Sequence, residues 1–157
     1  MIPWELLESA PVPGGSETLH LYRRGTEFSI RVDGNELMNS RAHGSEEALA
    51  ELACARLHTR PAPFVLIGGL GMGYTVAAAL KHLSSHARVV VAELVPAVIA
   101  WNRGPLAGLA GHLLKDIRVS VREIDVARIL QTEQQAYDAI LLDVMMGQMS
   151  GFKLADR

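Results

Sequence analysis

The sequence is poor in cysteine, in aromatic residues and in clusters of like charge. Cys54 is the single cysteine among 157 residues, so no internal disulfide can form and a disulfide framework is excluded. Aromatic residues make up 5% of the chain, too few to favour a platform on which nucleic-acid bases stack. The net charge is −2 and no basic run occurs, which gives no reason to expect nucleic acid or an anionic membrane as a partner.

Long apolar runs are also missing. The longest, Phe64 to Met72, contains glycines and falls far short of the ~20 residues that a membrane-spanning helix needs. The first eight residues carry charge instead of an apolar core, so they do not resemble a signal peptide. Together with the single cysteine, these absences predict a cytoplasmic protein. The whole chain, with 49% apolar and 20% charged residues, has the composition of a globular domain.

Residues 1–60 predict a small antiparallel sheet followed by a linking helix. A Pro/Gly/Ser loop precedes three short segments that predict strands, at 18–23, 27–32 and 36–39. The Asp33-Gly34 pair between the last two is a strong hairpin signal. Ser45 is expected to cap the helix, because two glutamates then lie in the first turn, where the helix dipole favours negative charge.

From residue 64 the pattern changes to an alternation of strands and helices. The expected strands lie at 64–67, 88–93, 118–124 and 137–143, and the expected helices at 75–86, 96–103 and 126–134. This alternation is typical of a parallel sheet with right-handed crossovers. We therefore predict an α/β fold in two parts. A Rossmann-like parallel sheet with helices on both faces (61–157) follows the small antiparallel sheet and its helix (1–60).

A glycine-rich loop joins the first expected parallel strand to its helix. It reads Gly68-Gly69-Leu70-Gly71-Met72-Gly73. Glycines at this point let the backbone turn tightly and approach a ligand, and the helix start that follows offers free N–H groups. The fingerprint Gly-x-Gly-x-x-Gly is not met, because Tyr74 stands at its third glycine, and no Gly-Lys-Ser/Thr of a Walker loop follows.

Acidic residues end the three strands that follow this loop, namely Glu93, Asp125 and Asp143. Ligands of open parallel sheets bind outside the carboxyl ends of the strands, so we expect the loop and these acids to converge on one crevice. Glu93 lies 20 residues after Gly73, where a carboxylate can accept the hydroxyls of a ribose. For Asp125, which precedes a helix, a simple N-cap role is the alternative.

These features, in this order, resemble the class I S-adenosylmethionine-dependent methyltransferase fold and, within it, the spermidine synthase (aminopropyltransferase) family. The resemblance covers about residues 18–144 and rests on four segments, at 65–73, 89–94, 125–127 and 137–143. It implies that Glu93 holds a ribose, that Asp125 reads the adenine amino group and that Asp143 acts as the catalytic base at the reacting amine. It also implies that the loop glycines back the sulfonium-bearing tail of the ligand, namely Gly68, Gly69, Gly71 and Gly73.

The resemblance further implies a transferase that moves an aminopropyl or methyl group to an amine. Its ligand would be S-adenosylmethionine, decarboxylated S-adenosylmethionine or the product methylthioadenosine, and no metal is expected. The expected partners are this nucleoside, an amine substrate and a second copy of the chain, without nucleic acid or membrane.

Two departures from the family keep a second hypothesis open. Spermidine synthases carry Gly-Gly-Gly-Asp-Gly-Gly in the loop, and Gly71 stands at the place of the aspartate. Their amine-binding segment, Asp-Glu-x-x-Tyr-His-Glu, matches residues 40–46, of which only Glu46 is retained. The alternative is a catalytically silent, nucleoside-binding or dimeric module of the same fold.

The end of the chain bears on both hypotheses. Residues 140–152 resemble the phospho-acceptor strand of response-regulator receiver domains, with Asp143 as the acceptor, but the acidic pair that receivers need upstream is missing. The methyltransferase-type fold has a seven-stranded sheet, and only four of its strands fit before Arg157. We therefore expect an incomplete sheet, or one that a partner subunit completes.

Overall fold

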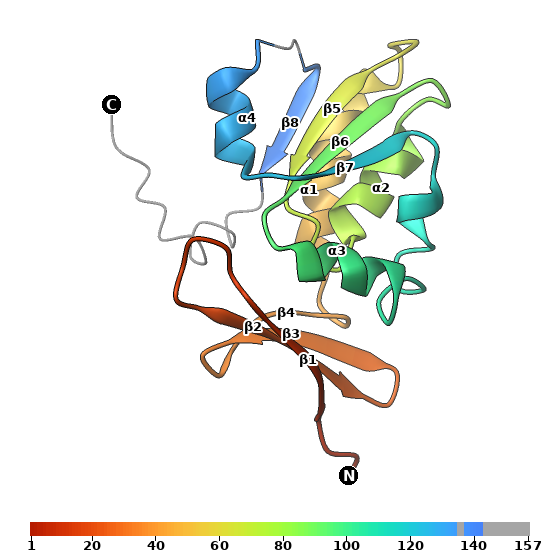
Figure 1. Cartoon of the computed structure of the whole chain (residues 1–157). Helices are drawn as coiled ribbons and strands as arrows, with labels where there is room; N and C mark the ends of the chain where they lie inside the picture. Colours follow the sequence, from red (N-terminus) through yellow and green to blue (C-terminus); the bar gives the residue numbers. More distant parts are fainter. Residues whose placement is uncertain (135–136, 143–157) are drawn as a thin grey trace.

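The computed structural model describes residues 1–134 and 137–142 (Figure 1). Two four-stranded sheets make up its framework. The first is antiparallel, in the order β1-β2-β3-β4. Its strands are β1 (Glu5–Pro11), β2 (Thr18–Arg24), β3 (Glu27–Val32) and β4 (Asn35–Asn39). The expected catalytic base, Asp143, and the receiver-like segment that begins with it lie outside the described residues.

The antiparallel sheet has one strand more than the sequence predicts. β1 pairs along β2, but its register shifts between Leu6 and Glu8. This irregularity breaks the alternation of apolar and polar residues by which a strand is recognised in a sequence. Of the residues in β1 only Ala10 is buried. A side-chain contact also holds the strand, because the Trp101 indole donates to the Glu8 carboxylate at 2.6 Å.

The second sheet is parallel, in the order β7-β6-β5-β8. Its strands are β5 (Phe64–Gly68), β6 (Arg88–Glu93), β7 (Val119–Glu123) and β8 (Ala139–Leu142). The chain first moves from β5 outward to β7 and then returns to the other side of β5. The strand order therefore reverses at β5, and the carboxyl end of β5 is the point where open parallel sheets bind ligands.

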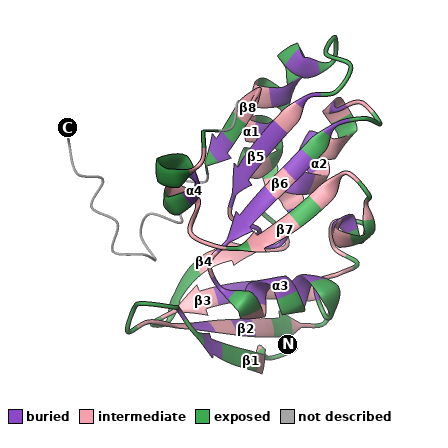
Figure 2. Cartoon of the chain, turned by 45° about the horizontal axis from the view of Figure 1, so that its top comes forward, coloured by how far each residue is buried: buried purple, intermediate pink, exposed green. Residues whose placement is uncertain are grey.

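Helices cover both faces of the parallel sheet, as predicted. They are α1 (Gly44–Cys54), α2 (Tyr74–His82), α3 (Pro96–Arg103) and α4 (Val126–Thr132). α1 packs against α2 and β8, and this side shares a core with the antiparallel sheet that includes Val65, Val89 and Leu19. On the opposite face, Leu66 packs with Ile129 of α4. Strands β5 and β6 are consequently buried along most of their length (Figure 2).

Several helix ends differ from the prediction by one to four residues, and those of α1 and α2 involve side-chain contacts. α1 begins at Gly44, one residue before Ser45, and the Ser45 hydroxyl donates to the side chain of Glu46 instead of capping the helix. α2 ends at His82 and not at residue 86, because Leu83 is already extended. The guanidinium of Arg118 donates to the carbonyls of Leu80 and Leu83 at 3.0 and 3.2 Å, which satisfies the end of this helix.

Candidate functional site

The glycine loop between β5 and α2 has an alternating conformation. Gly69, Gly71 and Gly73 have φ values of 99°, 54° and 87°, in the left-handed region that favours glycine. Leu70 and Met72, which separate them, are 4% and 1% exposed and anchor the loop in the core. The pattern Gly-x-Gly-x-Gly therefore reflects a loop in which the glycines turn the chain and the apolar residues between them anchor it in the core.

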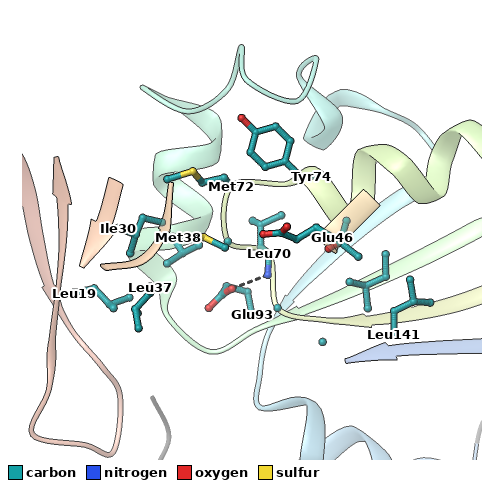
Figure 3. A pocket seen from close by; sticks show the side chains of 16 residues that line it. Leu19, Ile30, Leu37, Met38, Glu46, Leu70, Met72, Tyr74, Glu93 and Leu141 are labelled. Atoms are coloured by element: carbon teal, nitrogen blue, oxygen red, sulfur yellow. Dashed lines mark hydrogen bonds between the residues drawn. The ribbon is translucent and has the colours of Figure 1, made fainter. Parts of the chain in front are cut away.

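Glu93, at the end of β6, holds this loop through its carboxylate. One oxygen accepts the backbone N–H of Leu70 at 2.8 Å (dashed line in Figure 3), and the other accepts that of Val95 at 2.9 Å. The residue is 5% exposed. Burial raises the pKa of Glu93, and the N–H groups of Val95 and Leu70 oppose this rise by stabilising the charge. The backbone N–H groups of Gly71 and Leu94 also stabilise this charge, so a ligand bound to Glu93 would share its oxygens with backbone donors.

A pocket lies between the glycine loop and the antiparallel sheet (Figure 3). Its cavity volume is about 70 Å³ and it opens to solvent, so it is smaller than the roughly 300–1,000 Å³ of typical small-molecule sites. Four of the predicted site residues line it together, namely Gly68, Gly69, Gly71 and Glu93. The parallel sheet accounts for this convergence, because β5 and β6 end side by side, with Gly68 paired to Ala92.

The opposite wall of the pocket was not predicted. It comes from β2, β3 and β4 of the antiparallel sheet, and its residues are Leu19, Ile30, Leu37 and Met38. Alternation in the strands marks such positions as facing a core. That this core opens beside the glycine loop depends on how the two sheets pack.

Two other predicted residues, Asp125 and Gly73, are not part of the lining. Asp125 caps α4, where its carboxylate accepts the N–H of Ala127 at 2.9 Å, so the cap that the sequence offers as an alternative is present. Gly73 ends the loop, and a Cβ atom there would overlap the side chain of Leu113. Asp143 lies outside the described residues.

Asn102 of α3 is a further polar residue of the site that the sequence did not reveal. It is 5% exposed, and its amide donates to the carbonyl of Gly71 at 2.7 Å and to that of Val98 at 2.9 Å. The Glu93 carboxylate therefore holds the loop at Leu70, and the Asn102 amide holds it at Gly71. The sequence offered one signal for this role, because Asn102 is a polar residue in the last turn of a mostly apolar helix.

Tyr74 and His43 lie together at the rim of the pocket. Their rings are stacked, with centroids 3.9 Å apart, and the Tyr74 hydroxyl donates to the carbonyl of Ser40 at 3.3 Å. Burial raises the pKa of the Tyr74 hydroxyl, and the nearby charges of Glu46 and Glu47 raise it further. Negative potential is thus present on this side of the pocket.

The described part of the chain offers neither a metal cluster nor a membrane span. Within residues 1–134 and 137–142, no group of three or more His, Cys, Asp or Glu side chains is placed to hold a metal ion. Over the same residues, no helix combines the length and the apolar character that crossing a bilayer requires.

Two solved spermidine synthase structures match this architecture. One is a spermidine synthase in complex with the transition-state analogue AdoDATO, with a TM-score of 0.72, 21% identity and 90% of this chain covered. The other is the spermidine synthase from Thermotoga maritima, with a TM-score of 0.72, 21% identity and 89% of this chain covered. The chain has the spermidine synthase fold. It spans about half the length of these structures, 48% and 47%.

The likeness to spermidine synthase is one of structure. No family model matches the sequence, and no curated protein matches it either. The spermidine synthase fold confirms the predicted α/β class, with a Rossmann-like parallel sheet preceded by a small antiparallel sheet.

Proposed function

We propose that the protein is a spermidine synthase-like transferase that binds an adenine nucleoside with a sulfur-bearing tail. The candidate ligands are S-adenosylmethionine, its decarboxylated form and methylthioadenosine. One observation carries the proposal. A left-handed glycine loop and a buried carboxylate line the same pocket at the carboxyl end of β5, where the strand order reverses.

Each binding residue has a distinct role in this proposal. The Glu93 carboxylate, at the end of β6 and in the pocket lining, would accept the two vicinal hydroxyls of a ribose. Gly68, Gly69, Gly71 and Gly73 form the loop on which the tail would lie. At Gly68, Gly71 and Gly73 a Cβ atom would come within 3 Å of a neighbouring side chain. Asp125 would accept the adenine amino group with the carboxylate oxygen that does not cap α4.

The chemistry of the proposed transfer is a nucleophilic substitution. The amine nitrogen attacks a carbon next to the sulfonium, the C–S bond breaks, and its electron pair neutralises the sulfur. A neutral thioether nucleoside leaves, and the amine proton passes to a base, for which Asp143 remains our proposal. The protein acts mainly by bringing amine and carbon together and by accepting the proton. This chemistry calls for no metal.

Calorimetric titration of the full chain tests the nucleoside proposal. We expect saturable binding of at least one of the three candidate ligands with a micromolar dissociation constant. ATP is the control, because the loop lacks the lysine of a Walker motif, and it should bind at least tenfold more weakly. No binding of any of the three at millimolar concentration would exclude the proposal.

The silent-module hypothesis is favoured by one observation, which concerns the loop. The thioether of Met38 fills the space beside Gly71, where a Cβ atom would lie 2.6 Å from the Met38 methyl group. Incubation with decarboxylated S-adenosylmethionine and a mixture of amines, followed by mass spectrometry, separates the two hypotheses. Release of methylthioadenosine with formation of an alkylated amine supports a transferase, whereas binding without product supports the silent module.

The proposal places the protein in the cytoplasm as a homo-oligomer, without nucleic acid or membrane as partners. Cys54 is buried as a free thiol, which suits a reducing compartment. Within the described sheet β8 is an edge strand, and its Ile140 and Leu142 side chains are each 46% exposed. Apolar side chains on an edge strand favour burial against another protein surface.

Asp125→Ser is expected to separate the two roles of Asp125. Serine is as good an N-cap as aspartate, so the stability of α4 should change by less than about 0.5 kcal/mol. Its shorter side chain cannot also reach an adenine amino group, so nucleoside affinity should fall about tenfold, as expected for one hydrogen bond. Thermal unfolding and calorimetry measure the two effects. Unchanged affinity would reduce Asp125 to a helix cap.

A further inference from the structure

The part of the pocket that faces the antiparallel sheet is a hydrocarbon surface. Leu19, Ile30 and Leu37 form its far wall, Met38 covers Gly71, and Leu141 of β8 closes another side (Figure 3). Among the described lining residues there is no Arg, Lys or His. An anionic group that enters this space finds no basic partner among them, and a group packed against the three wall side chains is favoured when it is uncharged, because an ion without a partner is costly to remove from water.

Two carboxylates line the same pocket, and they stand in different situations. Glu93 is buried and accepts the N–H groups of Leu70 and Val95. Glu46, in the first turn of α1, is partly exposed, and its side chain points toward the pocket beside Leu70 (Figure 3). One of its oxygens accepts the Ser45 hydroxyl at 2.9 Å. Glu46 is thus the carboxylate suited to meet a cation at the mouth.

The charges around the mouth reinforce this assignment. Glu47 lies one residue further along α1 and bonds to the ring of His43 at 2.9 Å, and both Glu46 and Glu47 act electrostatically on Tyr74. The mouth thus attracts a cation, whereas the wall of Leu19, Ile30 and Leu37 offers a cation no partner. This gradient is suited to an amphipathic ligand with one charged end.

We propose that the amine site of this protein takes a monoamine with a hydrocarbon body, its single ammonium group held at Glu46 and its body packed on Leu19, Ile30 and Leu37. This inference rests on the proposed function in that it names the acceptor of the same pocket. A linear diamine would have to place its second ammonium group against these three side chains. The pocket therefore selects against polyamines.

A matched pair of ligands tests the proposal on the unmodified full chain. 1-Pentylamine and 1,4-diaminobutane have the same length and differ in one end, which is a methyl group in the first and an ammonium group in the second. We expect 1-pentylamine to bind at least tenfold more tightly, measured by calorimetry on the free protein and on the protein saturated with methylthioadenosine. Equal binding, or tighter binding of the diamine, would overturn the inference.

Substitutions at two positions test which residues produce the preference for 1-pentylamine over 1,4-diaminobutane. Glu46→Gln should weaken 1-pentylamine at least tenfold. Leu37→Asp places a carboxylate at the half-exposed end of the apolar wall and should shift the preference toward 1,4-diaminobutane by tenfold or more, whereas its uncharged control Leu37→Asn should not. Thermal unfolding confirms that each variant is folded. A Leu37→Asp variant that is folded but keeps the wild-type preference would contradict the placement of the hydrocarbon body.

Titrations with methylthioadenosine and with the two amines distinguish failure of this inference from failure of the proposed function. If methylthioadenosine binds and the amine preference is absent, this inference fails and the nucleoside proposal stands. A second outcome is that no nucleoside binds, that the free protein still prefers 1-pentylamine, and that the Glu46→Gln variant binds 1-pentylamine more weakly. In that case the proposed transferase fails and the amine pocket stands.

Discussion

Replacing Glu93 by alanine is expected to abolish nucleoside binding. Two hydrogen bonds from ribose hydroxyls to a carboxylate contribute about 1.5–3 kcal/mol each, so the affinity should fall at least ~100-fold. The loop also loses its clamp, because the N–H groups of Leu70 and Val95 are left without their acceptor. Calorimetry with methylthioadenosine measures the loss of affinity, and thermal unfolding measures the effect on the loop.

Glu123→Ala is the matched control for this experiment. Glu123 ends β7 directly beside Glu93 in the sheet register, but its side chain is exposed and it is not part of the pocket lining. Its removal changes the net charge equally and should leave the affinity within about twofold. A folded Glu93→Ala variant that binds methylthioadenosine as tightly as the unmodified chain would refute the ribose assignment.

Replacing Gly73 by alanine is expected to cause a large loss of stability. A left-handed φ costs an L-residue about 1–2 kcal/mol, and overpacking costs about 1–3 kcal/mol more. Both apply, since Gly73 has a φ of 87° and a Cβ there would overlap the side chain of Leu113 and come within 3.3 Å of Ala110. For a chain of this size the melting temperature should fall by about 5–15 °C.

Gly34→Ala separates the two causes of this loss. Gly34 has a φ of 79°, but a Cβ atom there would meet nothing within 4 Å. Its substitution should therefore cost only the backbone strain, about 1–2 kcal/mol. Equal losses in the two variants, measured by thermal or urea unfolding, would show that Leu113 yields without cost and that the packing beneath the loop is loose.

The parallel part of the fold was predictable because its signals are local. β5 and β6 are almost wholly apolar, as strands covered on both faces must be. The glycine loop follows β5 directly, and parallel strands end at one edge, so Gly69 and Glu93 had to lie close together. Both residues line the same pocket.

The features that the sequence did not reveal depend on distant parts of the chain. The end of α2 is determined by Arg118, which lies more than thirty residues further along the chain. β1 escaped detection because its bulge disrupts the alternation. The apolar wall around Leu37 belongs to the site only because the antiparallel sheet packs against the glycine loop, which no local pattern encodes.

The most direct test of the account is a crystal structure of the full chain grown with methylthioadenosine. We expect a ribose whose two hydroxyls lie about 2.5–2.9 Å from the carboxylate oxygens of Glu93, with the thioether tail along the loop from Gly69 to Gly71. A nucleoside bound away from Glu93, or a pocket without nucleoside at saturating ligand, would contradict it.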